Sequence, residues 1–393
     1  MNFQKSSVRR AVRCWAAASA WALSGLCAAQ APSTVPGVTA DSILIGANAT
    51  ITGPLAAAGG VIYPTIDAYF KKTNDEGGIN GRKLKFVYYD DAYDPSKTVG
   101  VAKKLVEVDK VFMMNTLGAG TTAAIADYLA ERNVPVVPAI TGSKKLLAYK
   151  NIFQMYPDYG TDGKTLARYA IDKLHAKSVA IWYQNDDFGK DEVAAVTEEL
   201  KKDKMQPVVA LPYNPTDMDF SSAVLKLKAA NPDVVILAPA QKPAAQFLKD
   251  AAKLGLKTQF LVSYAAADIS VSNLAGPAAE GVIFSSYQKT LVAEPNDPKM
   301  KELKEFAAKY LPGKEVSHYM FLGTYVAQLT VEALKRAGPD LTREKVIKAM
   351  EEMKDWNGAW IVDNVSYGPD QHGLGATAMY FMKIQNGKFV KIQ

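Results

Sequence analysis

The residue types that usually perform catalysis are sparse and scattered in this sequence of 393 residues. Its three histidines, His175, His318 and His372, lie far apart along the chain. Neither the zinc-binding pattern H-E-x-x-H nor the nucleophile-elbow pattern G-x-S-x-G occurs. We therefore expect no catalytic set, no metal site and no cofactor, and we predict that the protein is not an enzyme.

Pairs of acidic residues follow several predicted strands. Asp90-Asp91 and Asp186-Asp187 stand directly after such strands, where carboxylates commonly cap loops and helix starts. Asp217-Met218-Asp219 lacks the glycine and the terminal glutamate of a calcium-binding loop. We interpret all three groups as structural caps, the last one before a helix at Phe220.

Small, glycine-rich loops recur at the carboxyl ends of predicted strands. Thr52-Gly53-Pro54 follows the first strand, and residues 117–122, with the sequence LGAGTT, follow the third. In an open α/β sheet, ligands bind outside the strand ends. The second loop opens a helix, so its free N–H groups suit a carboxylate. Many tight turns between a strand and a helix look like this, so the loop alone favours an anion site only weakly.

The elements around these loops alternate between short β-branched runs and amphipathic segments, which is typical of a doubly wound α/β fold. The expected strands are 42–49, 84–89, 111–115, 134–138, 179–183, 207–211, 234–237, 260–262 and 282–285. The expected helices are about 62–73, 95–106, 121–131, 163–174, 189–202, 220–230 and 243–254, with three helical segments between 298 and 350. Short β segments are expected to follow them.

The first 29 residues are expected to be a cleaved signal peptide. Lys5, Arg9, Arg10 and Arg13 precede a short apolar run, and Ala29 ends the small-residue site. Cleavage would lower the net charge from +6 to about +2, so the basic composition does not indicate nucleic-acid binding. Both cysteines, Cys14 and Cys27, would leave with the segment. We expect a periplasmic protein without disulfides.

Ordered stretches along almost the whole remaining chain resemble one family, the periplasmic substrate-binding proteins of branched-chain amino acid ABC transporters, the leucine/isoleucine/valine-binding class. The stretches that carry the resemblance are 45–54, 74–84, 89–95, 187–190, 219–221, 255–260, 272–276 and 280–281. Each alone is a weak signal, but their common order is specific.

The resemblance implies a type I periplasmic binding protein fold, in which two Rossmann-like lobes are joined by three crossover segments. By that analogy the first lobe comprises residues 40–157 and 290–372, and the second 158–289 and 373–393. It also implies closure of the lobes on a small ligand and docking of a monomer on an ABC permease in the inner membrane.

The family's ligand-contacting positions can be carried over one by one. The serine and the threonine that hold the ligand carboxylate fall at Ala119 and Thr141, and an aromatic of the second lobe falls at Phe188. We also expect contacts from the loop and strand-end residues Gly118, Gly120 and Ala139. Aromatic positions of the family fall near Ala58 and Ala240.

The family's acid that pairs with the ligand ammonium falls at Tyr264. A buried ammonium needs an anionic partner, so this difference favours an aromatic or other hydrophobic carboxylic acid over an amino acid. Asp158, Asp186 or Asp268 can replace the missing acid, which leaves both ligand classes open. A sensor subunit of the same fold and, less favoured, a periplasmic hydrolase are the alternative functions.

We predict that export removes residues 1–29 and leaves a cysteine-free chain that begins at Gln30. The intact mass of the protein recovered from the periplasm measures this directly. An acylated Cys27 at the new N-terminus would show that the segment is a lipoprotein signal instead.

Overall fold

The computed structural model describes residues 35–374 and 378–392. The predicted signal peptide, 1–29, lies outside the described residues. The described part belongs to one compact unit, Val35–Gln393. Within it, two β-sheets organise the chain, and we call the parts built on them the first and second lobes.

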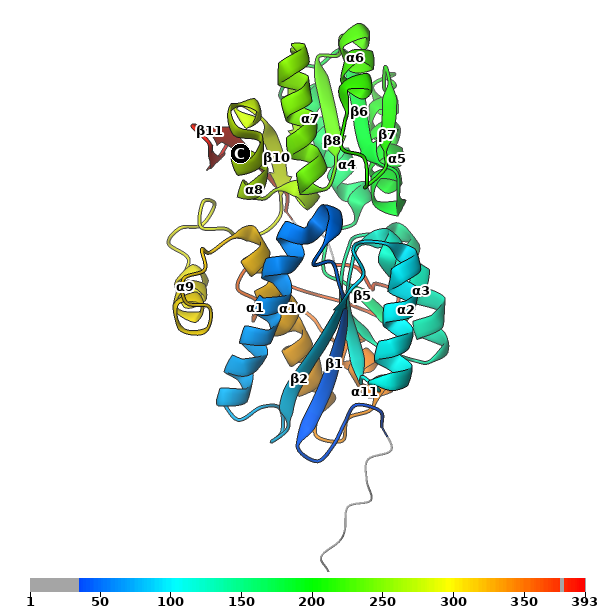
Figure 1. Cartoon of the computed structure of the whole chain (residues 1–393), viewed down its shortest axis with the longest axis vertical. Coiled ribbons are helices and arrows are strands. Elements are labelled where there is room, and N and C mark those ends of the chain that lie inside the picture. Colours follow the sequence, from blue (N-terminus) through cyan, green and yellow to red (C-terminus); the bar gives the residue numbers. More distant parts are fainter. Residues whose placement is uncertain (1–34, 375–377, 393) are drawn as a thin grey trace, which may run out of the picture. The chain divides into compact units, whose positions relative to one another are not determined.

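The first lobe is built on a five-stranded parallel sheet with the order β2-β1-β3-β4-β5 (Figure 1). Its strands are β1 (Ser42–Ala49), β2 (Lys83–Asp90), β3 (Met113–Leu117), β4 (Val136–Ile140) and β5 (Ile152–Gln154). Its helices are α1 (Ala56–Asp75), α2 (Pro95–Lys103), α3 (Ala119–Glu131), α9 (Pro298–Tyr310), α10 (His318–Ala337) and α11 (Arg343–Glu351). α1 packs against α10, and α2 packs against α3.

The second lobe is built on a seven-stranded sheet with the order β12-β11-β10-β9-β8-β6-β7. Its strands are β6 (Val179–Gln184), β7 (Ala210–Tyr213), β8 (Val234–Ala238), β9 (Gln259–Val262), β10 (Ile283–Ser286), β11 (Tyr380–Gln385) and β12 (Lys388–Lys391). β11 and β12 are antiparallel to their neighbours, and the other strands are parallel. Its helices are α4 (Tyr159–Asp172), α5 (Asp187–Lys202), α6 (Ser221–Ala230), α7 (Gln241–Leu254) and α8 (Ile269–Ala275).

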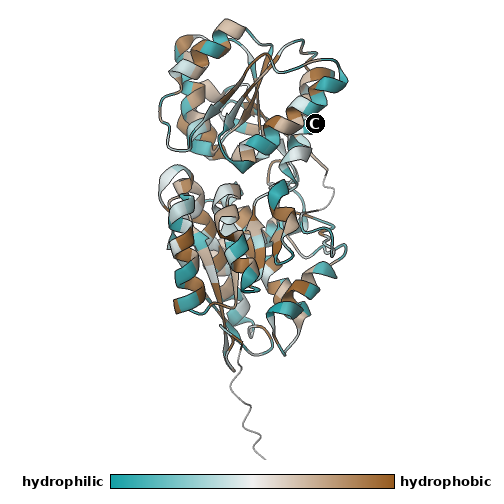
Figure 2. Cartoon of the chain, turned by 90° about the vertical axis from the view of Figure 1, so that its right-hand side faces the viewer, coloured by the Kyte–Doolittle hydropathy of each residue, from teal (hydrophilic) through white to brown (hydrophobic). Residues whose placement is uncertain are grey.

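Alternating side chains of the second sheet build two separate hydrophobic clusters. Trp182 and Leu237 join one cluster, whereas their neighbours Ile181 and Ile236 join the other. This follows from the two-residue period of a strand, which sends successive side chains to opposite faces. Because both faces are covered, the central strand β8, with the sequence VVILA, is hydrophobic and buried throughout, and Figure 2 shows much of this sheet in brown. Among the described residues, no helix is both long enough and apolar enough to cross a membrane.

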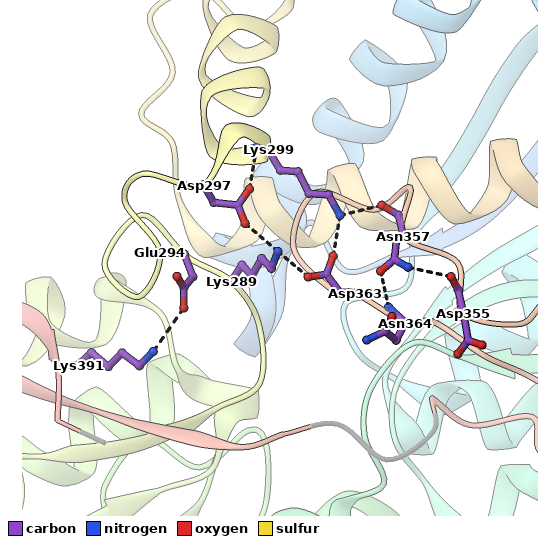
Figure 3. Close-up of polar contacts among 9 residues, drawn as sticks. All are labelled: Lys289, Glu294, Asp297, Lys299, Asp355, Asn357, Asp363, Asn364 and Lys391. Carbon is purple, nitrogen blue, oxygen red and sulfur yellow. Dashed lines mark hydrogen bonds and ion pairs between the residues drawn. The ribbon is translucent and has the colours of Figure 1, made fainter.

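The chain passes between the two sheets three times, after β5, after β10 and before β11, which confirms the expected type I fold. The exact lobe boundaries at 157, 289 and 372 stay a prediction. The segment after β10 is fastened by ion pairs (Figure 3). Lys289 contacts Asp297 at 2.7 Å and Asp363 at 2.5 Å, and Lys299 contacts Asp363 at 2.6 Å. Burial raises the pKa of Asp363, but the hydrogen bonds from the two lysines outweigh it, so this pKa lies below its ordinary value.

Several expected elements differ from those observed. β3, β4 and β7 each begin two or three residues later than expected, and β5 was not expected at all. The expected helix start at Gly163 is wrong, because α4 begins at Tyr159, where the Asp158 side chain accepts a hydrogen bond from Thr161 N–H. Asp94 caps α2, since its side chain accepts a hydrogen bond from Ser96 N–H.

The interpretation of the acid pairs as structural caps is confirmed. The Asp90 carboxylate accepts from the N–H groups of Ile51, Thr52 and Ala92. The buried Asp91 carboxylate accepts from side chains of β1, of the following loop and of α2, namely Asn48, Thr50 and Thr98. Asp219 likewise accepts from Ser221 N–H at the start of α6.

A buried carboxyl pair joins α4, α5 and the end of β9. The Ser263 hydroxyl oxygen lies 2.6 Å from Asp162 Oδ2 and 2.8 Å from Glu192 Oε1. One hydroxyl carries one proton, so these two contacts are both hydrogen bonds only if a carboxyl is protonated. Burial, and then the charge of Asp162, raise the pKa of Glu192 well above its ordinary value. Burial also raises the pKa of Asp162, but the hydrogen bond between the two carboxyls acts to lower that pKa and to raise the pKa of Glu192, so we assign the shared proton to Glu192.

This pair predicts a pH-dependent stability. The folded state binds the Glu192 proton more tightly than the unfolded chain does, so the free energy of unfolding falls as pH rises above the unfolded pKa of about 4.5. Glu192→Gln removes this proton and should flatten the fall above about pH 4.5, by about 1.4 kcal/mol for each pKa unit of the shift. Urea unfolding at a series of pH values measures it.

Glu198→Gln is the matched control, because Glu198 is exposed on the same helix. Identical pH profiles for wild type and Glu192→Gln would contradict the assignment of the proton to Glu192.

Candidate functional site

A cavity of about 510 Å³, measured with its open mouth, is lined by residues of both lobes. Most of its walls come from strand ends and from the loops and helix starts that follow them, and α1 and α10 supply Ile62, Tyr319 and Leu322. The first lobe contributes Leu55, Ala58, Ile62, Tyr93, Leu117, Gly118, Ile140, Tyr156, Tyr319 and Leu322. The second lobe contributes Tyr159, Gln184, Phe188, Pro239, Ala240, Gln241 and Ala265.

The cavity lining among the described residues carries no charged side chain. Aromatic rings supply much of the surface, and two glutamine amides with the tyrosine hydroxyls supply the side-chain polarity. Such a surface binds apolar and aromatic groups through contact area and orients them with a few hydrogen bonds. A ligand of high charge would lose its hydration here without gaining an opposite charge.

The start of α3 reaches the cavity wall through Gly118. Gly118 is the N-cap and lines the cavity with φ of +96° and ψ of 148°. The first bond of this helix runs from Thr122 N–H to Gly118 O, so the N–H groups of Ala119, Gly120 and Thr121 precede it. These groups and the positive end of the helix dipole favour a carboxylate.

Tyr93 contacts the second lobe beside this helix start. Its hydroxyl lies 3.3 Å from Asp186 Oδ2 and 3.3 Å from Gln184 Nε2, and Gln184 Nε2 also donates to Asp186 at 2.6 Å. Burial raises the pKa of Tyr93 well above its ordinary value, and the neighbouring Asp186 charge adds to the effect. Tyr93 is therefore a neutral hydroxyl that donates to the carboxylate across the lobes.

The structure brings four of the predicted site residues to the cavity wall, namely Ala58, Gly118, Phe188 and Ala240. Ala119 is buried at the first position of α3, directly after Gly118, and Gly120 follows it. Ala139 and Thr141 are buried at the end of β4 and lie outside the cavity lining. Their roles in ligand binding stay predictions.

Thr141 and Tyr264 are engaged within the protein. Thr141 N–H donates to Ala139 O, and the Thr141 hydroxyl lies 3.2 Å from the Tyr159 hydroxyl. The Tyr264 hydroxyl donates to Pro157 O at 2.7 Å. Its ring packs edge-on against Tyr156, with 5.4 Å between centroids, and stacks against Tyr159 at 6.1 Å. Tyr264 is absent from the cavity lining and supports two rings that belong to it.

Sequence reasoning missed Tyr93, Gln184, Gln241 and Tyr319. Gln184 is the last residue of β6, and Gln241 is the first residue of α7 after β8, so the strand-end rule was a sufficient signal for both. Tyr93 stands in the loop after β2, two residues after the acid pair Asp90-Asp91. Tyr319 had no such signal, because α10 follows no strand directly.

The described residues provide no catalytic arrangement for the hydrolase alternative. Ser263 contacts two carboxyl groups, is 0% exposed and has no histidine partner. No group of three or more metal-ligating side chains lies together in the part of the chain that the structure describes.

Known proteins resemble the chain over most of its length. The Leu/Ile/Val-binding protein of Escherichia coli (strain K12) is 29% identical over 267 residues, which are 67% of this chain and 73% of the relative. Two solved structures share the fold. A branched chain amino acid ABC transporter protein from Thermus thermophilus with bound valine has a TM-score of 0.80 at 21% identity, and covers 90% of this chain and 96% of its own. The fatty acid ABC transporter substrate-binding protein from Thermomonospora curvata has a TM-score of 0.80 at 24% identity, and covers 91% of this chain and 93% of its own.

The backbone at Gly118 predicts a sensitive position. A Cβ there would lie 2.5 Å from Tyr93 Cε2, in a conformation that only glycine adopts readily. Gly118→Ala should therefore lower the free energy of unfolding by about 1–3 kcal/mol through backbone strain alone. The collision with Tyr93 should lower it further and should displace Tyr93 from the cavity wall.

Gly338→Ala is the matched control, because Gly338 has φ of +81° and ψ of −173° but no heavy atom within 4 Å of a built Cβ. Denaturant unfolding of both variants separates backbone strain from collision. Equal losses of stability would contradict the predicted contact with Tyr93.

The cavity and both sheets fall inside one recognised family. The sequence model described as Periplasmic binding protein matches residues 42–388, which include every residue of the cavity lining. The chain belongs to the periplasmic binding protein family.

Proposed function

We propose that this chain is the solute-binding protein of an ABC importer, which captures a small hydrophobic or aromatic carboxylate or amino acid and delivers it to a permease in the inner membrane. The observation that carries the proposal is the cavity lined from both lobes, with an aromatic, uncharged surface. Binding in such a cavity needs no reactive group.

The relatives support a hydrophobic ligand. The Escherichia coli relative is named as a Leu/Ile/Val-binding protein, the Thermus thermophilus structure holds valine, and the Thermomonospora curvata protein is named for fatty acids. Each of these compounds has a carboxylate and an apolar part, which is either a side chain or a hydrocarbon chain. The aromatic lining with its α3 start matches both parts.

Within that class, we favour an aromatic or other hydrophobic carboxylic acid without a free ammonium group. The position at which the family's acid was expected is Tyr264, whose hydroxyl is bound to Pro157 O. The cavity lining itself contains no carboxylate that can neutralise an ammonium. Ala58 and Ala240 stand where larger aromatic residues were expected, and they leave room for a ring.

Ligand capture follows from the two-lobed lining. A ligand that contacts Tyr156 and Leu322 of one lobe together with Phe188 and Ala240 of the other makes its full set of contacts only when both lobes meet it. It therefore stabilises that arrangement over any in which the lobes separate. The permease would then recognise the loaded arrangement. We propose that the exported protein acts as a monomer in the periplasm.

The test is a ligand screen by thermal shift and calorimetry with phenylacetate, para-toluate, phenylalanine and leucine. Specific binding raises the free energy of unfolding by about 2.7 kcal/mol at a ligand concentration one hundred times Kd. We expect the two acids without an ammonium group to bind more tightly than the amino acids. Tight binding of leucine with no response to the acids would reject the preferred ligand class, and no binding of any compound would reject the proposed function.

A further inference from the structure

The N-cap and the first turns of α5 carry three acids that contact the first lobe, namely Asp186, Asp187 and Asp191. Asp187 and Asp191 are four residues apart and therefore lie on the same face of the helix. All three acids lie outside the described cavity lining, although Phe188 of the same turn belongs to it. The start of α5 thus makes two separate sets of contacts, one with the cavity and one with the other lobe.

Asp186 receives hydrogen bonds from both lobes. Its Oδ2 accepts from Gln184 Nε2 at 2.6 Å and its Oδ1 accepts from Gly189 N–H at 3.2 Å, and both donors belong to the second lobe. The third donor is the Tyr93 hydroxyl of the first lobe, at 3.3 Å. Burial raises the pKa of Asp186, so a charge at this position is costly and depends on its donors. When the lobes separate, Asp186 keeps the two donors of its own lobe and exchanges Tyr93 for water.

Asp191 caps a segment of the first lobe. Lys144 N–H, at the start of the 3-10 helix η3 (Lys144–Ala148), donates to Asp191 Oδ2 at 3.0 Å. The preceding residue, Ser143, makes no side-chain capping bond among the described residues. A helix cap normally comes from the residue that precedes the helix, whereas this one comes from the other lobe. The bond between Lys144 and Asp191 therefore exists only while the lobes are in contact.

Asp187 adds an exposed ion pair. Lys145 Nζ lies 3.6 Å from Asp187 Oδ2, and the lysine side chain is 61% exposed. Ion pairs of this kind contribute little to stability, because water and salt screen the two charges. The hydrogen bonds of Asp186 and Asp191 are therefore expected to supply most of the interaction between α5 and the first lobe.

We propose that the start of α5 is a closure interface, at which Asp186 and Asp191 stabilise the closed arrangement of the lobes without contacting the ligand. This inference rests on the proposed function, because it gives both residues a part in ligand capture. The closure interface sets how readily the lobes close, whereas the cavity lining sets which ligand is bound.

A contact that exists only in the closed arrangement acts on every ligand alike. The observed affinity of a ligand is its affinity for the closed arrangement, reduced by the fraction of the protein that adopts this arrangement. A weaker closure interface lowers that fraction, and it does so by the same factor for all ligands. A residue of the cavity lining such as Phe188, in contrast, affects each ligand according to its chemistry.

The experiment measures Kd by calorimetry for phenylacetate, para-toluate, phenylalanine and leucine. For each compound that binds the wild type, Asp191→Ala should raise Kd by the same factor, about fivefold, which corresponds to the loss of one helix cap. Asp191→Asn keeps an acceptor and should recover most of the affinity, because Asn caps a helix about as well as Asp does. Unchanged Kd values in Asp191→Ala, or factors that differ clearly between the compounds, would overturn the inference.

Glu198→Ala is the matched control. Glu198 lies on the same helix and is 63% exposed, and its ion-pair partner at 3.3 Å, Lys164, belongs to the same lobe. Closure does not change this contact, so the variant should keep every Kd at the wild-type value. A loss of affinity equal to that of Asp191→Ala would assign the effect to the total charge of α5 and overturn the closure interface.

A distance measurement tests the closure interface without any ligand. No cysteine follows Cys27 in the sequence, so introduced cysteines can be labelled selectively in the exported chain. Spin labels at Lys97→Cys on α2 and Lys226→Cys on α6 stand on exposed positions of the two lobes and report the distance between them.

In the empty protein, Tyr93→Phe and Asp191→Ala should each shift the distribution of label distances toward longer values, because each variant removes a contact of the closed arrangement. Glu198→Ala should leave the distribution unchanged. A distribution that neither Tyr93→Phe nor Asp191→Ala alters would overturn the closure interface. Failure of all four compounds to bind would reject the proposed function, and the distance measurement would then decide on the closure interface alone.

Discussion

Neighbouring parallel strands end at the same edge of their sheet, so the loops and helices that follow them begin at that edge. The cavity is built mainly from these segments. In both sheets the strands β3, β6 and β8 end at the edge where α3, α5 and α7 begin. Helix starts carry unpaired N–H groups and strand ends carry the side chains of short loops. The polar atoms at the cavity, from the α3 start to Gln184 and Gln241, are consequences of that order.

The length and the flanking residues of each element explain how much of the fold the sequence predicted. β1 was predicted residue for residue, because apolar side chains run through it and Thr52-Gly53-Pro54 ends it. β5, with only three residues, is too short to have a recognisable period, and its place depends on pairing with β4. α4 begins at Tyr159, one turn before the predicted start at Gly163, because the Asp158 side chain caps it.

The site was harder to predict than the fold, for a physical reason. Positions carried over from a family assume that equivalent residues face the ligand, but a side chain's direction depends on its neighbours. Tyr264 illustrates this, because its hydroxyl finds Pro157 O and its ring finds Tyr156 and Tyr159, so it supports the wall of the cavity from behind. Long-range packing also brings Tyr319 to the cavity, and no local pattern in the sequence signals that.

No charged side chain of the described residues lines the cavity, and several acids and lysines outside it have their partners within the protein. Asp91 receives four hydrogen bonds, including one from Tyr93 N–H, and Asp162 and Glu192 share Ser263. Lys289 and Lys299 are held by the acids of Figure 3, after the second passage between the lobes. A buried charge is tolerated when its partners lie within the protein, and none of these charges then remains to compete for the ligand. What is left in the lining are uncharged side chains, including the amides of Gln184 and Gln241.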